Sequence, residues 1–306
     1  MAFNIIFMGT PVFAVPILKA IFKSKHNVLE VYTQPPKKMY RGQKINFSPI
    51  HKYCLDNKIK VRHPKTLDTI TECNYFSKLK ADLVIVVAYG KILPKNLLSI
   101  KNLKFVNIHA SLLPKWRGAA PIHRAIMNLD QETGISIMQI IPKLDAGPVM
   151  MNSKINITKT TNFETLSNKL SMLGSRLILE SLDKIEKGEE KFIPQTESRA
   201  TYAKKITKSE SRIDWCDSAS KVVAKINALN PQPGTWFEYN KSRIKVIKAI
   251  ELEEKGSPGE IIKDNFTVAC GTNSIQILEI QKEGKNKMKT LEFLKGNSLK
   301  IGDKIK

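Results

Sequence analysis

The chain has 306 residues, with 50 Lys and Arg against 28 Asp and Glu, which gives a formal net charge of +22. Hydrophobic residues make up 42% and charged residues 25%. This composition is typical of globular chains with a sizeable core, so wholesale disorder is excluded. The length favours two domains, and the positive charge predicts an anionic partner.

The sequence also gives indications about targeting signals, membrane spans, disulfides and metal sites. The N-terminal stretch is apolar, but it lacks a basic leading region and is interrupted by Gly9, Pro11 and Pro16, which argues against a signal peptide. The longest apolar run, residues 83–88, is far shorter than the roughly 20 residues of a transmembrane helix. Four scattered cysteines without a C-x-x-C pair indicate neither disulfides nor zinc. We therefore expect a cytoplasmic monomer with no membrane association and no metal.

The first third of the chain alternates strand and helix patterns. The predicted strands are 4–8, 28–33 and 82–88, and the predicted helices are 11–21, 48–57 and 66–79. The uninterrupted β-branched run at 82–88 is typical of a parallel strand that is buried on both faces. This alternation predicts an α/β fold, a Rossmann-like doubly wound domain.

The same domain is expected to extend to residue 188. Further along the chain the patterns predict strands at 104–109, 134–141 and 149–157 and helices at 119–129 and 162–187. Residues 189–210 are polar and without clear periodicity, so we predict a linker there. The domain boundaries are therefore 1–188, 189–210 and 211–306.

The C-terminal part has a different pattern. After one predicted helix at 219–229, short β-rich runs alternate with turns that are rich in Gly, Asn, Pro and Lys. Several short strands at this spacing predict a small β-barrel of the oligonucleotide-binding (OB-like) type over 211–306.

One pair of polar side chains stands out in the predicted sheet. Asn107 and His109 are two residues apart in one strand, so they project from the same side near its carboxyl end. Open α/β sheets bind ligands at that end. A polar pair at a strand terminus is also compatible with a purely structural role, but a turn-rich loop with Trp116 and Arg117 follows and favours a site.

A histidine in such a site needs a carboxylate partner. Asp145 lies in a Leu-Asp-Ala-Gly-Pro loop just beyond another predicted strand, although an Asp before Ala-Gly is also a common turn former. The other histidines are expected to be solvated or packing residues; they are His26, His51, His63 and His123.

The positive charge is concentrated in one window. Residues 37–65 contain nine basic side chains against the single acid Asp56. Such a window attracts a phosphate backbone, an anionic membrane face or an acidic protein. Lysines account for 42 of the 50 basic residues, which is also what AT-biased coding produces, so part of the excess has no functional meaning.

Four short motifs follow one another along the chain. They are Gly-Thr-Pro-x-Phe-Ala at 9–14, Asn-x-His-x-Ser-Leu-Leu-Pro at 107–114, Trp-Arg-Gly-Ala-Ala-Pro at 116–121 and Leu-Asp-x-Gly at 144–147. In this order and spacing, the chain resembles the 10-formyltetrahydrofolate-dependent formyltransferases. The resemblance is closest to members that act on initiator methionyl-tRNA, which have an insertion and a C-terminal barrel similar to 34–48 and 209–306 here.

The resemblance implies an activity and its catalytic residues. It implies transfer of the formyl group of 10-formyltetrahydrofolate, a cosubstrate, to the α-amino group of methionine on initiator methionyl-tRNA, for translation initiation. The family's catalytic Asn, His and Asp fall on Asn107, His109 and Asp145. This fits the chemistry, because an amide donor and a protonated imidazole can stabilise an oxyanion while a carboxylate moves a proton.

The resemblance also implies where the two substrates bind. The positions expected to hold folate are Ser111, Leu112, Leu113, Pro114 and Gln139, with Ile92 and Leu93 as apolar walls. Ile92 and Leu93 are equally good core residues. The positions expected to contact tRNA, in the inserted loop 34–48, are Lys37, Lys38, Arg41 and Lys44. A second basic surface is expected over 282–306, which holds eight basic residues against three acids.

Two other functions remain open at this point. The formyl chemistry could serve a small acceptor such as a glycinamide ribonucleotide or an amino-sugar nucleotide, but such an acceptor explains neither the basic loop nor the appended barrel. The chain could instead be a catalytically silent RNA-binding protein, but the intact Asn107, His109 and Asp145 argue against it.

Overall fold

A computed structural model describes residues 2–39, 44–239, 241–297 and 299–305. The chain forms two compact units. The first comprises Met1–Pro121, Thr133–Ile155 and Ser167–Ala203, and the second comprises Ile122–Glu132, Asn156–Leu166 and Lys204–Lys306. Each unit has its own sheet, so each is described separately.

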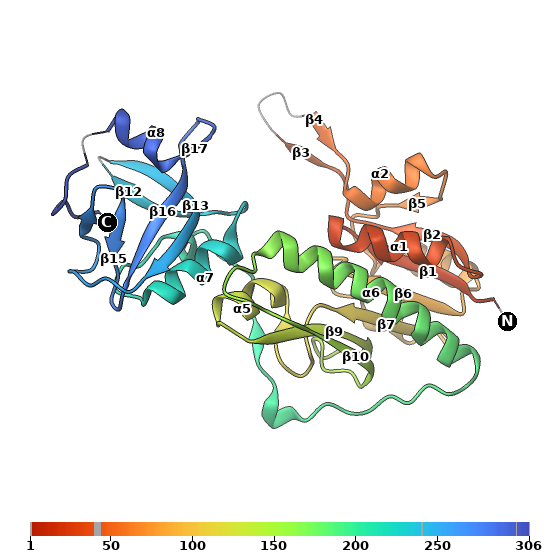
Figure 1. The fold of residues 1–306 in the computed structure, drawn as a ribbon. Coiled ribbons are helices and arrows are strands. Elements are labelled where there is room, and N and C mark those ends of the chain that lie inside the picture. Colours follow the sequence, from red (N-terminus) through yellow and green to blue (C-terminus); the bar gives the residue numbers. More distant parts are fainter. Residues whose placement is uncertain (1, 40–43, 240, 298, 306) are drawn as a thin grey trace. The chain divides into compact units, whose positions relative to one another are not determined.

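The first unit is built on a seven-stranded sheet in the order β10-β9-β7-β6-β1-β2-β5 (Figure 1). The central strands run parallel to one another, whereas β9 pairs with β7 in antiparallel fashion. The bounds are β1 Asn4–Gly9, β2 Asn27–Tyr32, β5 Val61–Arg62, β6 Leu83–Val87, β7 Lys104–His109, β9 Glu132–Gln139 and β10 Val149–Asn156.

Helices cover both faces of this sheet. Phe76 of α3 and Leu97 of α4 pack with Val84 and Phe105 in one buried cluster. On the other face, the close approach of α6 at Gly174 leaves an added Cβ only 3.3 Å from Ile108 and Ile17, which places α6 against β7 and α1. The bounds are α1 Val15–Phe22, α2 Pro49–Asp56, α3 Ile70–Lys78, α4 Lys95–Leu98 and α6 Phe163–Glu186. Helix α5 (Pro121–Met127) belongs, from Ile122 on, to the second unit. The doubly wound α/β domain predicted from the sequence is confirmed.

Two short pairs of strands supplement the main sheet. β3 (Lys37–Met39) and β4 (Lys44–Asn46) form an antiparallel pair within the predicted insertion. β8 (Arg117–Gly118) and β11 (Tyr202–Ala203) pair in parallel. The second pairing places residues up to 203 in the first unit. The boundaries at 188 and 210 stay predictions, because they divide the chain by sequence pattern rather than by packing.

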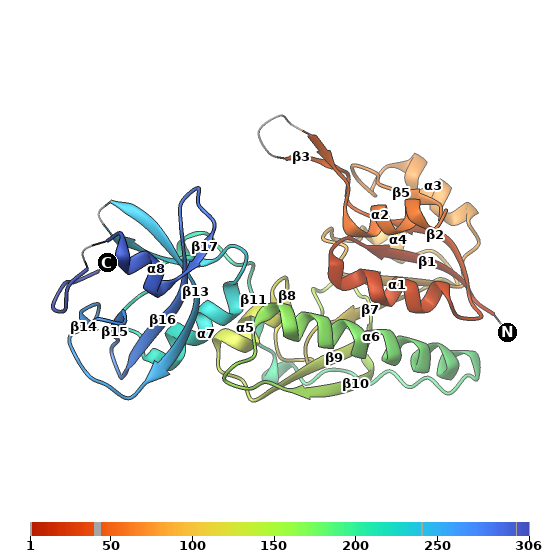
Figure 2. The ribbon, with the colours of Figure 1, turned by 45° about the horizontal axis from the view of Figure 1, so that its top comes forward.

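The second unit has an antiparallel sheet in the order β12-β13-β16-β15-β14, with β17 beside β16 (Figure 2). Helix α7 packs against β13 and β16. Buried aromatic rings form its core, with Phe237 edge-on to Trp215 and to Phe266 and with Phe266 stacked on Phe293. The bounds are α7 Ala219–Leu229, β12 Thr235–Tyr239, β13 Ser242–Leu252, β14 Ile261–Lys263, β15 Thr267–Ala269, β16 Ser274–Lys282, β17 Lys287–Lys289 and α8 Thr290–Lys295. This is the predicted β-rich C-terminal domain.

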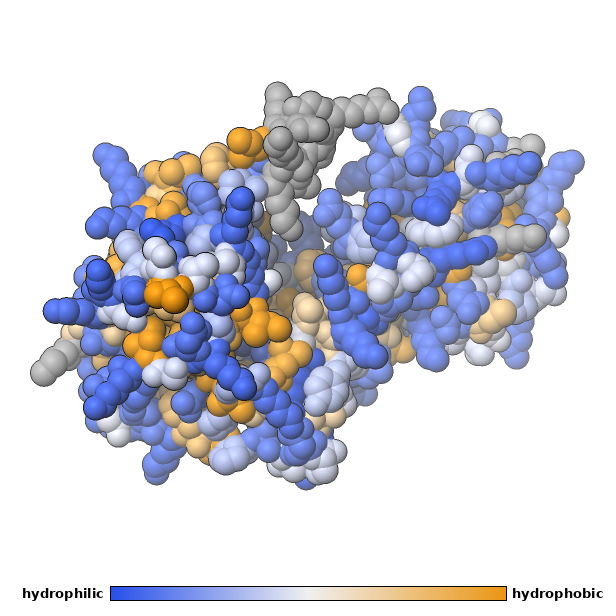
Figure 3. Space-filling view, turned by 180° about the vertical axis from the view of Figure 1, so that it is seen from behind, coloured by the Kyte–Doolittle hydropathy of each residue, from blue (hydrophilic) through white to orange (hydrophobic). Residues whose placement is uncertain are grey.

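The surface is mostly hydrophilic. On the face of each unit seen in Figure 3, apolar residues form scattered patches between charged and polar side chains. None of the helices in the described part of the chain is long and apolar enough to cross a membrane.

Candidate active site

Strand β7 presents the first two predicted catalytic residues. It lies between β6 and β9, where Asn107 pairs with Val86 on one side and with Met138 on the other. His109, two residues on, pairs with Ser136, so its side chain lies on the same side of the sheet as that of Asn107. His109 is 94% buried and Asn107 is partly buried. The amide of Asn107 has no hydrogen-bond partner among the described residues, which leaves it free to bind a substrate.

The loop between β9 and β10 brings in the third residue. Asp145 Oδ2 lies 3.7 Å from His109 Nδ1. The same oxygen accepts a hydrogen bond of 2.8 Å from the backbone N–H of Gly118. The φ angle of Asp145 is +45°, a left-handed conformation that Asp tolerates better than most residues. The structure therefore brings His109 and Asp145 together, although they are far apart in sequence.

Both ring nitrogens of His109 face acceptors. Nε2 lies 2.9 Å from the carbonyl oxygen of Trp116, and Nδ1 faces the Asp145 carboxylate. A neutral imidazole has one N–H, whereas the protonated ring has two donors. Two acceptors therefore face the ring of His109, and the amide of Asn107 lies on the same side of the sheet.

The Trp-Arg-Gly motif is the framework of this arrangement. Gly118 has a φ of +121°, and a Cβ added there would meet the carbonyl oxygen of Ala203 at 2.8 Å. This position therefore requires glycine, both for its backbone angle and for the close approach of β11. The β8–β11 pairing in turn fixes the position of the Gly118 N–H, which donates to the Asp145 carboxylate.

A buried arginine lies under the same motif. The Arg117 side chain is fully buried, and its Nη1 donates to both carboxylate oxygens of Glu197 at 3.0 and 3.1 Å. Lys143 binds the same carboxylate at 2.7 Å. The Lys143 ammonium and the Arg117 guanidinium hold the pKa of Glu197 below its usual range. Burying a guanidinium costs free energy unless it is paired with a carboxylate, and Glu197 provides that carboxylate for Arg117.

Arg117 also contacts a residue that the sequence did not single out. Its Nε donates to Gln195 Oε1 at 3.0 Å. Gln195 lies in the stretch predicted to be a linker, where neither periodicity nor a motif marks it. The one available signal was Arg117 itself, because an arginine in an otherwise small and apolar motif needs acceptors from elsewhere.

The predicted folate positions have different environments. Ser111 is fully buried, and Ser136 Oγ ties its loop by donating to the Ser111 carbonyl (2.7 Å) and accepting from the Leu113 N–H (3.0 Å). Leu112 and Pro114 are partly buried, and Gln139 is exposed at the end of β9. Ile92 is 86% exposed, whereas Leu93 packs in the core cluster beneath the sheet. Of these two apolar positions, Ile92 is thus the one with a surface free for a ligand.

The predicted tRNA-contact positions lie in the β3–β4 pair. Lys37 and Lys38 are in β3, and Lys44 begins β4. Arg41 lies outside the described residues. The β3–β4 pair therefore projects from the main sheet of the first unit (Figure 1).

The second unit has a charged aromatic surface that sequence reasoning missed. Trp236 of β12 is partly buried, with the Arg243 guanidinium 4.3 Å from its ring centroid and the Arg212 guanidinium 5.7 Å away. Lys245 is its direct partner across the β12–β13 pairing. We call these four residues the Trp236 patch. They belong to different segments, which is why no local motif showed their assembly.

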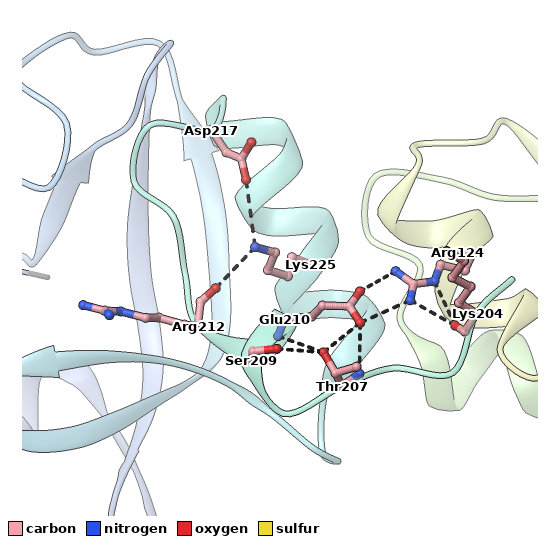
Figure 4. Close-up of polar contacts among 8 residues, drawn as sticks. All are labelled: Arg124, Lys204, Thr207, Ser209, Glu210, Arg212, Asp217 and Lys225. Carbon is pink, nitrogen blue, oxygen red and sulfur yellow. Dashed lines mark hydrogen bonds and ion pairs between the residues drawn. The ribbon is translucent and has the colours of Figure 1, made fainter.

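Polar contacts organise the entry into this unit (Figure 4). Arg124 of α5 binds Glu210 through two hydrogen bonds of 2.6 and 3.3 Å, and it also donates to the carbonyl of Lys204. This pairing lowers the pKa of Glu210 to about 2. Lys225 of α7 donates to the carbonyl of Arg212 at 3.3 Å. The backbone on both sides of Ser209 is therefore held in place before the sheet begins.

The described residues contain no group of three or more His, Cys, Asp or Glu side chains that could hold a metal ion. At the candidate site, Asn107, His109 and Asp145 offer an amide, an imidazole and a carboxylate, which can form hydrogen bonds and transfer protons.

Comparisons with known proteins place this geometry in context. Residues 3–182 match the family model described as formyl transferase, and residues 205–298 match formyl transferase, C-terminal domain. The methionyl-tRNA formyltransferase of Pelagibacter ubique is 49% identical over 304 residues, covering 99% of this chain and 98% of that protein. The corresponding protein of Paramagnetospirillum magneticum is 41% identical over 300 residues and 98% of both chains.

Solved structures share the fold at lower identity. An N-formyltransferase from Helicobacter canadensis, in complex with folinic acid and dTDP-3-aminofucose, aligns with a TM-score of 0.68 at 20% identity, covering 92% of this chain and all of that one. A methionyl-tRNA formyltransferase from Clostridium thermocellum aligns with a TM-score of 0.57 at 17% identity, covering 83% and 95%.

Proposed function

The chain belongs to the formyltransferase family, and from this premise we propose that Asn107, His109 and Asp145 transfer the formyl group of 10-formyltetrahydrofolate to the α-amino group of methionine on initiator methionyl-tRNA. The protein is a methionyl-tRNA-formylating enzyme of translation initiation, like the relatives that match it over nearly their whole length. The observation that supports these catalytic residues is the contact of Asp145 with both His109 and the Gly118 N–H.

The reaction makes three demands on the site. The neutral amine of methionine attacks the formyl carbon, the carbonyl oxygen becomes negative, and the bond from that carbon to the folate nitrogen then breaks. The free amide of Asn107 donates to the developing oxyanion, and the protonated ring of His109 adds a positive charge nearby. A donor of this kind is worth about 3–4 kcal/mol of transition-state stabilisation.

Proton balance assigns a role to Asp145. The attacking amine loses one proton as it becomes a formamide, and the departing folate nitrogen gains one. A carboxylate beside an imidazole can accept the first proton, directly or through water, and the pair can return a proton to the leaving nitrogen. The distance of 3.7 Å between Asp145 Oδ2 and His109 Nδ1 supports this role for Asp145.

The formyl donor binds, in this proposal, along the loop that follows β7. Ser136 holds the Ser111–Leu113 backbone from below, which gives Ser111, Leu112, Leu113 and Pro114 a fixed shape against which a flat pterin can pack. Gln139 is exposed at the end of β9 and can contact polar groups of the folate, and the exposed Ile92 offers apolar surface. Leu93 supports this region from the core.

The acceptor is a charged tRNA, which calls for basic surface beyond the chemical site. The β3–β4 pair supplies Lys37, Lys38 and Lys44 on the first unit, and Arg41 lies in the same insertion. On the second unit, the Trp236 patch combines three cations with an aromatic ring. Such cations bind the phosphates of single-stranded RNA, and such a ring stacks on its bases. We propose that both surfaces contact tRNA and that the protein acts as a cytoplasmic monomer.

A small acceptor is the alternative for the same chemistry. The fold alone does not exclude it, because the Helicobacter canadensis N-formyltransferase, whose structure is a complex with dTDP-3-aminofucose, shares this fold. The identity of 41–49% to methionyl-tRNA formyltransferases over the whole chain favours the tRNA substrate.

The test compares acceptors directly. Purified protein is incubated with 10-formyltetrahydrofolate and one of three acceptors: charged initiator Met-tRNA, uncharged initiator tRNA or a small amino compound. We expect formylation of Met-tRNA only. Formylation confined to the small acceptor would refute the tRNA substrate, and the absence of any formylation would refute the enzyme.

A further inference from the structure

The side-chain amide of Gln195 binds the backbone of the loop that contains Asp145. Gln195 Nε2 donates to the carbonyl oxygen of Asp145 at 2.9 Å and to that of Gly147 at 2.7 Å. Both carbonyls are acceptors only, so the nitrogen of the Gln195 amide must point toward the loop. These two bonds hold the backbone at Asp145 and at Gly147, two residues later, and the φ of +45° at Asp145 needs such support from its surroundings.

Gln195 is itself held by Arg117. The Oε1 atom of Gln195 accepts from Arg117 Nε at 3.0 Å. Arg117 cannot move readily, because its side chain is fully buried and paired with Glu197. The Gln195 side chain therefore links a rigid buried cation on one side to the Asp145 backbone on the other.

The same short strand also holds the carboxylate of Asp145. Gly118, the residue after Arg117, donates its N–H to Asp145 Oδ2 at 2.8 Å. Strand β8 thus fixes Asp145 twice, at its side chain through the Gly118 backbone and at its main chain through Arg117 and Gln195. A carboxylate that must face His109 at a defined distance benefits from both restraints, since a misplacement of about 1 Å can cost about 100-fold in rate.

We propose that Gln195 is a positioning residue for formyl transfer: anchored on Arg117, it holds the Asp145 loop so that the carboxylate faces His109. This inference rests on the proposed function, since it assigns Gln195 to the same reaction. Gln195 does not need to touch either substrate, and its contribution is made through Asp145.

Two substitutions separate the two interactions of Gln195, one with Arg117 and one with the carbonyls of Asp145 and Gly147. Gln195→Ala removes both interactions. Gln195→Glu keeps the volume and an acceptor for Arg117 but replaces the donor to the two carbonyls with a carboxylate oxygen. Glu190→Gln is the matched control, because Glu190 binds Lys104 at 2.6 Å near the start of the same segment and is not in the site. Thermal unfolding of each variant is measured beside the kinetics.

We expect kcat for Met-tRNA formylation to fall about 10- to 100-fold in Gln195→Ala and by as much in Gln195→Glu. The KM for Met-tRNA should stay within about 2-fold of the wild type, because the lost interaction acts on the reacting groups rather than on binding. Glu190→Gln should keep the wild-type kcat. If truncation disturbs folding, the isosteric Gln195→Glu variant decides the question.

Three results would overturn the inference: a wild-type kcat in Gln195→Glu, a loss that lies in KM alone, or an equal loss in Glu190→Gln. In each case an active wild-type enzyme shows that the proposed function stands while the positioning role fails. An inactive wild-type enzyme would instead refute the proposed function, and the positioning role with it.

Discussion

The backbone N–H of Gly118 donates to the carboxylate of Asp145 at 2.8 Å, although 27 positions separate the two residues. The acceptor is the same oxygen that faces His109. A fixed backbone donor sets the direction of the carboxylate. The imidazole therefore faces a carboxylate whose orientation is set by the Trp-Arg-Gly motif.

Replacing either member of the proposed catalytic pair, His109 and Asp145, should remove activity without unfolding the protein. Asp145→Asn keeps the shape and an acceptor for Gly118 but removes the charge that faces His109. We expect kcat to fall by about 100-fold or more in Asp145→Asn and in His109→Ala. Steady-state formylation and thermal unfolding are the measurements, with Asp183→Asn, an exposed carboxylate on α6, as the control. Near-normal turnover in either variant would remove that residue from the mechanism.

The Gly118 position should tolerate no side chain. In Gly118→Ala the new Cβ would lie 2.8 Å from the carbonyl of Ala203, and φ is +121°. We expect a loss of about 2–3 kcal/mol of stability together with a lower kcat, because β8 must shift and take its N–H away from Asp145. Gly188→Ala is the matched control, since Gly188 also has a positive φ (+69°) but has nothing within 4 Å of an added Cβ. Equal effects of the two substitutions would show that backbone angle alone matters.

The basic insertion should act through phosphate. Arg41→Ala should raise the KM for charged tRNA and reduce the slope of log affinity against log salt by about 1, while the KM for 10-formyltetrahydrofolate stays unchanged. Binding measured between 50 and 200 mM salt, with the exposed Lys187→Ala of the first unit as a control, tests this. A change in folate affinity would place the insertion at the folate instead.

The Trp236 patch should contribute stacking as well as charge. We expect Trp236→Ala to weaken binding of charged tRNA by roughly 10-fold, with little change in the salt slope, because a stacked base is worth about 1–3 kcal/mol. Arg243→Ala should weaken binding and also reduce the salt slope. Leu291→Ser, at an exposed position of the same unit, is the control. Wild-type tRNA affinity in Trp236→Ala would exclude the patch from the tRNA interface.

The sequence was informative where structure is local or periodic. Strand β6 was predictable because a strand buried in a parallel sheet has a continuous apolar run. Strand β7 begins at Lys104 and ends at His109, as expected. The start of helix α3 was predicted less accurately. The helix begins at Ile70 rather than near Thr66, because the Thr69 side chain accepts from the Glu72 N–H and caps it there.

Long-range contacts set the limit of prediction at the site. The proposed catalytic residues could be named from motifs, but β8 and β11 are two residues long and have no periodicity to detect. Gln195 lies in a polar stretch whose composition is that of a linker. Its role depends on a guanidinium 78 positions away, and only the folded chain brings them together.

The pH dependence of stability should reveal a partly buried histidine in the second unit. The His123 ring stacks on Phe163 with centroids 4.1 Å apart, and burial, followed by the charge of Arg124, lowers the pKa of His123 to about 4. Between pH 6.5 and 4 the unfolded chain binds a proton at this position that the folded chain resists, so the free energy of unfolding should fall as the pH falls. The full effect is up to about 3 kcal/mol, at about 1.4 kcal/mol per pKa unit.

His123→Phe tests this assignment because it keeps a ring against Phe163 and removes the titration. Thermal or urea unfolding at pH 7.5, 6, 5 and 4 should show a smaller loss of stability in this variant than in the wild type. Glu210→Gln is the matched control. The pKa of Glu210 is lowered to about 2, so its contribution is complete above pH 4.5 and is lost only as the pH falls toward 2. An unchanged slope between pH 6.5 and 4 in His123→Phe would mean that His123 is protonated in the folded protein at no cost.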